Sequence, residues 1–205
     1  HLKTTPLEDA KRRDFTINGM FLDPATDTII DFVQGQADLS QKIIRTIGNP
    51  IERFTEDRLR MIRAIRFQNR FHFEIESETA EAIKKLGNTV LPAVSMERIY
   101  MELNKIHIYG NTCKALCTMH ELSLLQALFP SLYNISKKEL VIRLHNLDEL
   151  GNRVPLILIL ATALEMDSQL LEVIDFLKGT NEDRKWMIAY LETKKIVAQK
   201  EIPSS

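Results

Sequence analysis

The strongest constraint on the fold of this chain is a helical spacing of apolar residues that continues, with few breaks, from Gly35 almost to the end. The 205 residues include only seven glycines and seven prolines, and residues with high helix propensity dominate. The spacing therefore predicts a mostly α-helical protein. We expect helices over residues 51–69, 77–86, 95–106, 111–122, 137–149, 155–164, 168–178 and 182–200.

Only the first fifth of the sequence has the pattern of β-strands. Two short runs, 15–22 and 28–33, flank an Asp-Pro-Ala-Thr-Asp turn, which predicts a β-hairpin. A β-branched run, 43–47, stops at a Gly-Asn-Pro turn. A second boundary, between a middle and a C-terminal helical module, is expected near a Phe-Pro-Ser sequence at 129–131. The predicted divisions of the chain are therefore 1–50, 51–130 and 131–205.

Composition narrows the classes of function. The formal net charge is −1 and the isoelectric point is about 6.6, so contact with nucleic acid would need a local basic patch. Cys113 and Cys117 lack the partners of a zinc site, and the histidines show no metal-ligand spacing. The longest apolar run, 155–164, is about half of a membrane span. We expect a cytoplasmic protein that does not bind a membrane, and leave its oligomeric state open.

The segment 51–70, as one predicted helix, has apolar side chains on one face and charged side chains on the opposite face. One face is apolar, and the other carries Arg53, Glu56, Asp57 and Arg60. Asp57 and Arg60 are three residues apart, so a carboxylate acceptor would project beside a guanidinium donor. Cytosine and adenine both present an amino donor beside a ring-nitrogen acceptor, whereas uracil and guanine present the reverse order. The pair is a candidate for selecting C and A, with a discrimination of about 1–3 kcal/mol.

The same charges have a simpler interpretation as salt bridges on a solvated helix, each contributing roughly a few tenths of a kcal/mol. Spacing alone leaves both interpretations open. Arg63 and Arg66 continue the three-residue spacing and rotate toward one flank, where a triphosphate could lie. Between Lys42 and Arg70, eight basic residues stand against three acidic ones. This stretch supplies the local basic patch that the overall composition lacks.

A series of motifs follows in consistent order between about residues 7 and 106. They are Arg12-Arg13-Asp14-Phe15-Thr16-Ile17-Asn18, then Asp31 and Gly35, Ile47-Gly48-Asn49-Pro50, Arg53-Phe54, Glu56-Asp57 with Arg60, then Arg63, Arg66-Phe67, and Ser95 with Glu97-Arg98-Ile99 and Glu102. Together they closely resemble the family of class II CCA-adding enzymes, which are tRNA nucleotidyltransferases, and bacterial poly(A) polymerases. Beyond residue 106 the resemblance is only general.

The resemblance implies a role for each motif. The first motif of the family binds the sugar and phosphates of the incoming nucleotide, the acidic pair with its arginine selects C or A, and later arginines contact ATP or CTP. By position, the expected nucleotide-binding residues are Arg13, Asp14, Asn18, Glu56, Asp57, Arg60, Arg63 and Arg66. Arg70 and Arg98 are weaker expectations, as contacts to RNA.

The family's catalytic head contains an Asp-x-Asp carboxylate pair that holds two magnesium ions, after a strand turn rich in glycine and serine. This sequence has no such element, so we expect no catalytic or metal-binding residue in it and no activity from the chain alone. The implied fold is the C-terminal part of an α/β nucleotidyltransferase head, with a short β-hairpin, followed by an all-helical neck and body.

Three functions stay open at this point. The first is addition of CCA, from CTP and ATP, to the 3′ ends of tRNA, with residues 131–205 holding the tRNA. The second is poly(A) addition, which in the family usually accompanies a strongly basic C-terminal extension. Residues 155–205 show no such extension, which favours CCA addition. The third is a non-catalytic RNA-binding module that has lost its catalytic head.

Overall fold

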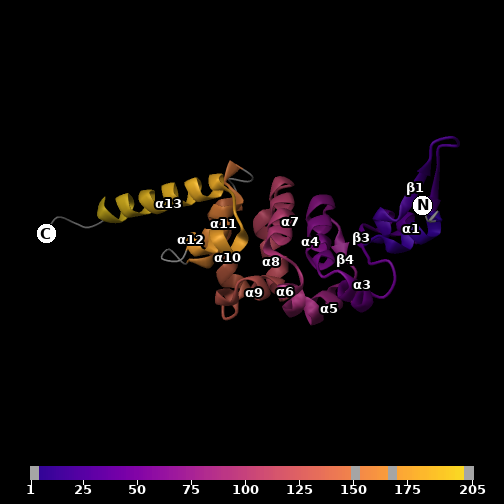
Figure 1. Ribbon diagram of the computed structural model, residues 1–205, viewed down its shortest axis with the longest axis horizontal. Coiled ribbons are helices and arrows are strands. Elements are labelled where there is room, and N and C mark those ends of the chain that lie inside the picture. Colours follow the sequence, from indigo (N-terminus) through magenta and orange to yellow (C-terminus); the bar gives the residue numbers. More distant parts are fainter. Residues whose placement is uncertain (1–4, 149–152, 166–169, 201–205) are drawn as a thin grey trace.

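The computed structural model describes residues 5–148, 153–165 and 170–200. Its elements follow one another along the long axis of the molecule, from α1 and the β1–β2 hairpin at one end to α13 at the other (Figure 1). Most of the described residues are helical, and the strands belong to the N-terminal half. The predicted fold class, mostly α with a short hairpin, is confirmed.

The N-terminal end combines short helices with the hairpin. Its elements are α1 (Pro6–Arg12), the 3-10 turn η1 (Thr16–Asn18), β1 (Met20–Asp23), β2 (Thr28–Asp31), α2 (Gly35–Gln41) and β3 (Ile43–Ile44). β1 and β2 pair antiparallel with Met20 opposite Asp31, as the turn residues predict. The start of α2 presses against η1, since a Cβ atom at Gly35 would lie 2.4 Å from the carbonyl oxygen of Thr16.

Two backbone pairings connect this end to the helices. The extended backbone around Phe15 bridges antiparallel to Thr46, and β3 pairs in parallel with β4 (Glu74–Ile75). After β3, Gly48 adopts a positive φ of 83°, which favours glycine. Asn49 then caps the next helix by accepting a hydrogen bond from the backbone N–H of Ile51 at 2.9 Å.

The expected single helix over 51–69 is wrong, because it consists of two helices, α3 (Pro50–Glu56) and α4 (Leu59–Phe71). Asp57 lies between them with extended backbone, φ −146° and ψ 104°. Its carboxylate accepts a hydrogen bond from the backbone N–H of Leu59 at 3.1 Å. An aspartate that bonds a nearby backbone N–H competes with helix continuation, which accounts for the break.

The remaining helices build the body of the molecule. They are α5 (Ser77–Leu86), η2 (Gly87–Thr89), α6 (Val90–Ala93), α7 (Met96–Ile108), α8 (Thr112–Glu121), α9 (Leu124–Leu128), η3 (Pro130–Leu132), α10 (Lys137–Asp148), α11 (Leu156–Leu164), α12 (Leu170–Leu177) and α13 (Asn181–Lys200). The helices predicted after residue 76 are confirmed to within two residues wherever both ends are described. Two predicted ends, 149 and 168, lie outside the described residues.

One hydrophobic core runs through the described part of the chain. Its buried members extend from Phe15 to Met187 in a single cluster. Phe129 and Leu132, at the predicted second joint, are themselves buried in that cluster, and Phe129 meets the Phe176 ring edge-on at 6.4 Å. The divisions at residues 50 and 130 stay predictions.

None of the described helices combines the length and the apolar character that crossing a bilayer requires.

Candidate functional site

A cavity of about 500 Å³ opens between the segment 12–18, the junction of α3 and α4, and the start of α7. It is lined by Arg12, Arg13, Asp14, Asn18, Asp57, Leu59, Arg60, Arg63 and Arg98. Six of the eight residues expected to bind nucleotide are in this group, together with Arg98. The fold therefore brings three distant stretches of the sequence to one concave surface.

Phe15 fixes the first of these stretches on α4. Its ring is fully buried and meets Phe67 edge-on, with centroids 5.6 Å apart. The flanking backbone pairs with the segment 45–47, through Thr16 N–H to the Arg45 carbonyl at 3.0 Å and Ile47 N–H to the Asp14 carbonyl at 3.1 Å. Because side chains alternate along extended backbone, burial of Phe15 helps to set the direction of the side chain before it.

Asp14 joins the first stretch to α4. Its buried carboxylate accepts hydrogen bonds from Arg63, at 2.7 Å from Nε, and from the Asn18 amide at 3.0 Å. A buried charge is stable only with partners of this kind. The three expected residues are thus brought together, and Asp14 holds the other two at the cavity wall.

Arg12 and Arg13 differ in the contacts that their side chains make with other described residues. Arg13 donates to Asp9 at 2.9 Å and to the Asn18 carbonyl at 2.8 Å, and its guanidinium carbon lies 4.7 Å from the centroid of the Phe21 ring. Arg12 is exposed, and its side chain makes no hydrogen bond or ion pair with any residue that the structure describes. Arg12 is not among the residues expected from the sequence, because the resemblance assigns the phosphate contact to its neighbour.

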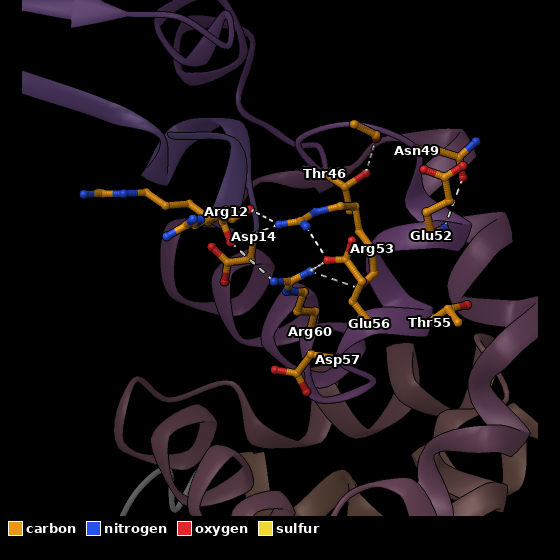
Figure 2. A network of polar contacts seen from close by, with 12 residues as sticks. Arg12, Asp14, Thr46, Asn49, Glu52, Arg53, Thr55, Glu56, Asp57 and Arg60 are labelled. Atoms are coloured by element: carbon orange, nitrogen blue, oxygen red, sulfur yellow. Dashed lines mark hydrogen bonds and ion pairs between the residues drawn. The ribbon is translucent and has the colours of Figure 1, made fainter. Parts of the chain in front are cut away.

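Arg60 and Arg53 form a network around one carboxylate (Figure 2). Arg60 Nη1 donates to Glu56 at 2.9 Å and to the Arg53 carbonyl at 3.1 Å, while Nη2 donates to the Arg12 carbonyl at 3.3 Å. Arg53 donates to Glu56 and to the carbonyls of Arg12 and Arg13, at 3.0 and 2.6 Å. Glu56 is not among the residues that line the cavity, and it orients both guanidinium groups.

Arg53 and Arg60 do not stand on an open helix face. Their side chains are only 11% and 15% exposed, because the segment 12–13 covers them. Burial is the first cause that lowers the pKa of Arg53, and the nearby positive charge of Arg60 is the second. Arg60 still has N–H groups, including Nε–H, that make no hydrogen bond with the described residues.

Asp57 stands beside Arg60 at the junction of α3 and α4 (Figure 2). One carboxylate oxygen is held by the Leu59 N–H, and the other lies 3.5 Å from Arg98 Nη2. Asp57 and Arg60 both line the cavity, so the acceptor and the donor predicted from the sequence share one wall. Asp57 lies in the break between α3 and α4, and Arg60 lies in the first turn of α4, so the two side chains do not come from one continuous helix.

Arg66 and Arg70 lie outside the cavity. Each step of three residues rotates the side chain by about 60° around the helix, which carries the later arginines away from it. Arg66 Nη1 lies 3.2 Å from the buried Glu102 carboxylate on α7, and burial lowers the pKa of Arg66. Arg70 lies at the end of α4, 5.1 Å from the centroid of the Phe71 ring and 4.6 Å from that of Tyr109.

The charge of the cavity wall indicates which ligands it can hold. Five arginines and two carboxylates line it, and this excess of positive charge suits a polyphosphate. Metal binding does not fit the same residues, because both carboxylates already face arginines. Within the described residues, no group of three or more histidine, cysteine or acidic side chains could hold a metal ion.

Comparison with family models identifies two matching regions. Residues 1–45 match the poly A polymerase head domain, and residues 72–135 match the probable RNA and SrmB-binding site of polymerase A. Poly(A) polymerase I of Salmonella typhi is 42% identical to this chain over 125 residues, which are 61% of this chain and 27% of that protein.

Solved structures give the same relationship. The CCA-adding enzyme of Bacillus stearothermophilus, in complex with CTP, superposes with a TM-score of 0.77 and 31% identity over 92% of this chain and 47% of that one. The Thermotoga maritima CCA-adding enzyme complexed with tRNA gives a TM-score of 0.74 and 28% identity, over 97% of this chain and 50% of that one. The chain spans about a quarter of the Salmonella protein and about half of each solved enzyme. In sequence and in fold, the chain belongs to the family of CCA-adding enzymes and bacterial poly(A) polymerases.

Proposed function

We propose that this chain selects the nucleotide in a template-independent nucleotidyltransferase that adds CCA, from CTP and ATP, to the 3′ ends of tRNA. The observation that carries the proposal is the Asp57–Arg60 pair on the wall of an arginine-lined cavity. A carboxylate beside a guanidinium presents an acceptor beside donors, and this order matches cytosine and adenine.

In this proposal Asp57 accepts a hydrogen bond from the exocyclic amino group, and an N–H of Arg60 donates to the ring nitrogen. Uracil or guanine would place a carbonyl against the carboxylate and an N–H against the guanidinium. Those polar groups would be left unpaired, which disfavours the wrong base by about 1–3 kcal/mol. Glu56 contributes indirectly, because it holds Arg60 in position.

The phosphates of the nucleotide lie, in this proposal, against the arginines on the other side of the cavity. Arg12 lines the cavity and makes no side-chain hydrogen bond or ion pair among the described residues, so its guanidinium is available to a triphosphate. Arg63 and Arg13 are held in place by Asp14 and Asp9 and can each present further N–H groups. Arg66, paired with Glu102, has a structural role in the proposal.

RNA contacts of the chain are proposed outside the cavity. Arg70 is exposed between two aromatic rings at the end of α4, and the described residues provide no carboxylate partner for it. Such a cation can bind a phosphate of the RNA backbone. The helical body is proposed to hold tRNA, which the similar Thermotoga enzyme carries in its solved complex.

Poly(A) addition is the second candidate, since the Salmonella relative is a poly(A) polymerase and one matched model carries that name. The test uses the full-length protein with a tRNA that lacks CCA and with all four nucleoside triphosphates. Extension by three nucleotides, in the order C, C, A, supports the proposal. Long runs of A favour the second candidate, and no extension with any RNA would contradict both.

The bond-forming step is not assigned to residues of this chain, because its sequence lacks the Asp-x-Asp carboxylate pair that the resemblance implies for the catalytic head. We therefore propose that the isolated 205-residue chain binds CTP and ATP but extends no RNA in the presence of Mg²⁺. Extension by the isolated chain would show that it contains catalytic carboxylates after all. Binding without extension would support the assignment of roles.

A further inference from the structure

We infer that Arg98 is a positioning residue that sets nucleotide specificity by orienting Asp57. The inference deepens the proposed function and rests on it. From the sequence, Arg98 is expected to contact RNA. The structure instead places it on the cavity wall, with Nη2 at 3.5 Å from Asp57 Oδ2.

The need for such a residue follows from the position of Asp57 in a helix break. The backbone N–H of Leu59 holds one carboxylate oxygen at 3.1 Å. That single bond leaves rotation of the carboxylate incompletely fixed, and the other oxygen is the one available to a base. Arg98 is the cation whose ion pair reaches that second oxygen among the described residues.

The separation between the two groups leaves the carboxylate able to bind a base. Charge-assisted N–H···O bonds measure about 2.7–2.9 Å, and 3.5 Å exceeds this range. Arg98 therefore attracts Asp57 Oδ2 without using its lone pairs in a short hydrogen bond. An amino group of cytosine or adenine can share the same oxygen while the ion pair keeps the oxygen directed into the cavity.

The two selecting residues are consequently supported from different parts of the fold. Arg60 is held by Glu56 and by backbone carbonyls at the same end of the molecule. Asp57 depends on α7, the helix that carries Arg98. One turn after Arg98, Glu102 pairs with Arg66 and ties α7 to α4. The spacing between these helices thereby sets the distance from Arg98 to Asp57.

An RNA contact by Arg98 is the competing interpretation, since its side chain is 54% exposed. The two roles have different consequences. Loss of an RNA phosphate contact weakens RNA binding equally for every incoming nucleotide. Loss of a residue that orients Asp57 changes the ratio of correct to incorrect nucleotide and leaves RNA affinity unchanged.

The experiment measures kcat and KM for CTP and UTP, and the Kd for RNA, in the full-length protein. For Arg98→Ala we expect the CTP/UTP ratio of kcat/KM to fall roughly two- to five-fold, the range for a partly exposed ion pair, mainly through the KM for CTP. Arg98→Lys, which keeps the charge, should recover most of the ratio. Lys84→Ala, an exposed cation on α5 outside the cavity lining, is the control and should leave the ratio unchanged.

A double variant identifies the route of the effect. Asp57→Ala with Arg98→Ala should be no less selective than Asp57→Ala alone, because Arg98 acts through that carboxylate. Additive losses, or an unchanged ratio with weaker RNA binding in Arg98→Ala, would overturn the inference alone. An unchanged ratio in Asp57→Ala would instead refute the proposed selection itself.

Discussion

The cavity end and the C-terminal helices share one hydrophobic core, but at the cavity end a network of hydrogen bonds between distant segments is added to it. At the cavity end, Arg53 and Arg63 reach back to the segment 12–14 through hydrogen bonds of 2.6 to 3.0 Å. In the C-terminal half, α11 consists of leucine, isoleucine and alanine side chains apart from Thr162, and most of them are buried. Hydrogen bonds have direction, whereas apolar burial does not. One end should therefore control the geometry of ligand binding, and the other should control stability.

Leu160→Ala should have the largest effect, and it should act on stability alone. Leu160 is 1% exposed in α11, so its loss leaves a cavity that costs about 2–5 kcal/mol in the free energy of unfolding. Denaturant unfolding measures this cost, and Leu171→Ala, at a 39% exposed position in α12, is the smaller matched control. A change in the CTP/UTP ratio of kcat/KM in folded Leu160→Ala protein would contradict the proposal that the two ends control different properties.

Asp57→Ala should have the opposite profile. Without the carboxylate, preference for CTP over UTP should fall by about 1–3 kcal/mol, measured as the ratio of kcat/KM for single-nucleotide addition. The variant also loses the cap on Leu59 N–H, so a stability change of about 1 kcal/mol is expected. Asp57→Asn retains a capping oxygen and separates the two effects. Undiminished preference in both variants would contradict base reading by this side chain.

Glu56→Gln should have a smaller effect on the same ratio. Glu56 pairs with Arg53 and Arg60, but its own side chain is exposed, so loss of its charge should cost about 0.2–1 kcal/mol. The carbonyls of Arg12 and Arg53 still hold Arg60. We expect selectivity to fall less than in Asp57→Ala, with the unfolding transition nearly unchanged. A larger loss than in Asp57→Ala would mean that Glu56 itself contacts the base.

The smallest expected effect is a pH dependence of stability that leaves selectivity constant. Burial lowers the pKa of His107, on α7, below its ordinary value of 6.5. At acidic pH the unfolded chain therefore binds more protons at this histidine than the folded protein does. The stability that is fully present above pH 6.5 is lost as the pH falls through the pKa of His107 in the folded protein. Unfolding free energies measured from about pH 7.5 to 5.5 should decline, and His107→Gln should flatten the slope. An equal decline in that variant would assign the effect to other groups.

The sequence predicts the long helices well because each has several turns over which apolar spacing can repeat. α5 is predicted with both ends correct, whereas α2, α6 and α9 are too short for such a pattern and are not predicted. The break at Asp57 is missed for another reason. A helical wheel places side chains but does not weigh an aspartate's own bond to the backbone against helix continuation.

The residue types of the site are predictable, but their partners are not. The motifs point to Asp57, Arg60 and Arg63, and all three line the cavity. No local pattern indicates that Arg53 bonds the carbonyls of the segment 12–13, or that Arg98 faces Asp57, because these contacts join residues about 40 positions apart. Such contacts arise from packing of the whole N-terminal half.

The bond from Arg60 to the carbonyl of Arg12 has a consequence for how this protein can change over evolution. Every amino acid carries that carbonyl, so replacement of the Arg12 side chain need not disturb the guanidinium proposed to read the base. If the proposed roles hold, the charge at position 12, and with it the affinity for a triphosphate, can therefore vary while the choice of base stays the same. A single residue can therefore change the affinity for the nucleotide without changing the fidelity of its selection.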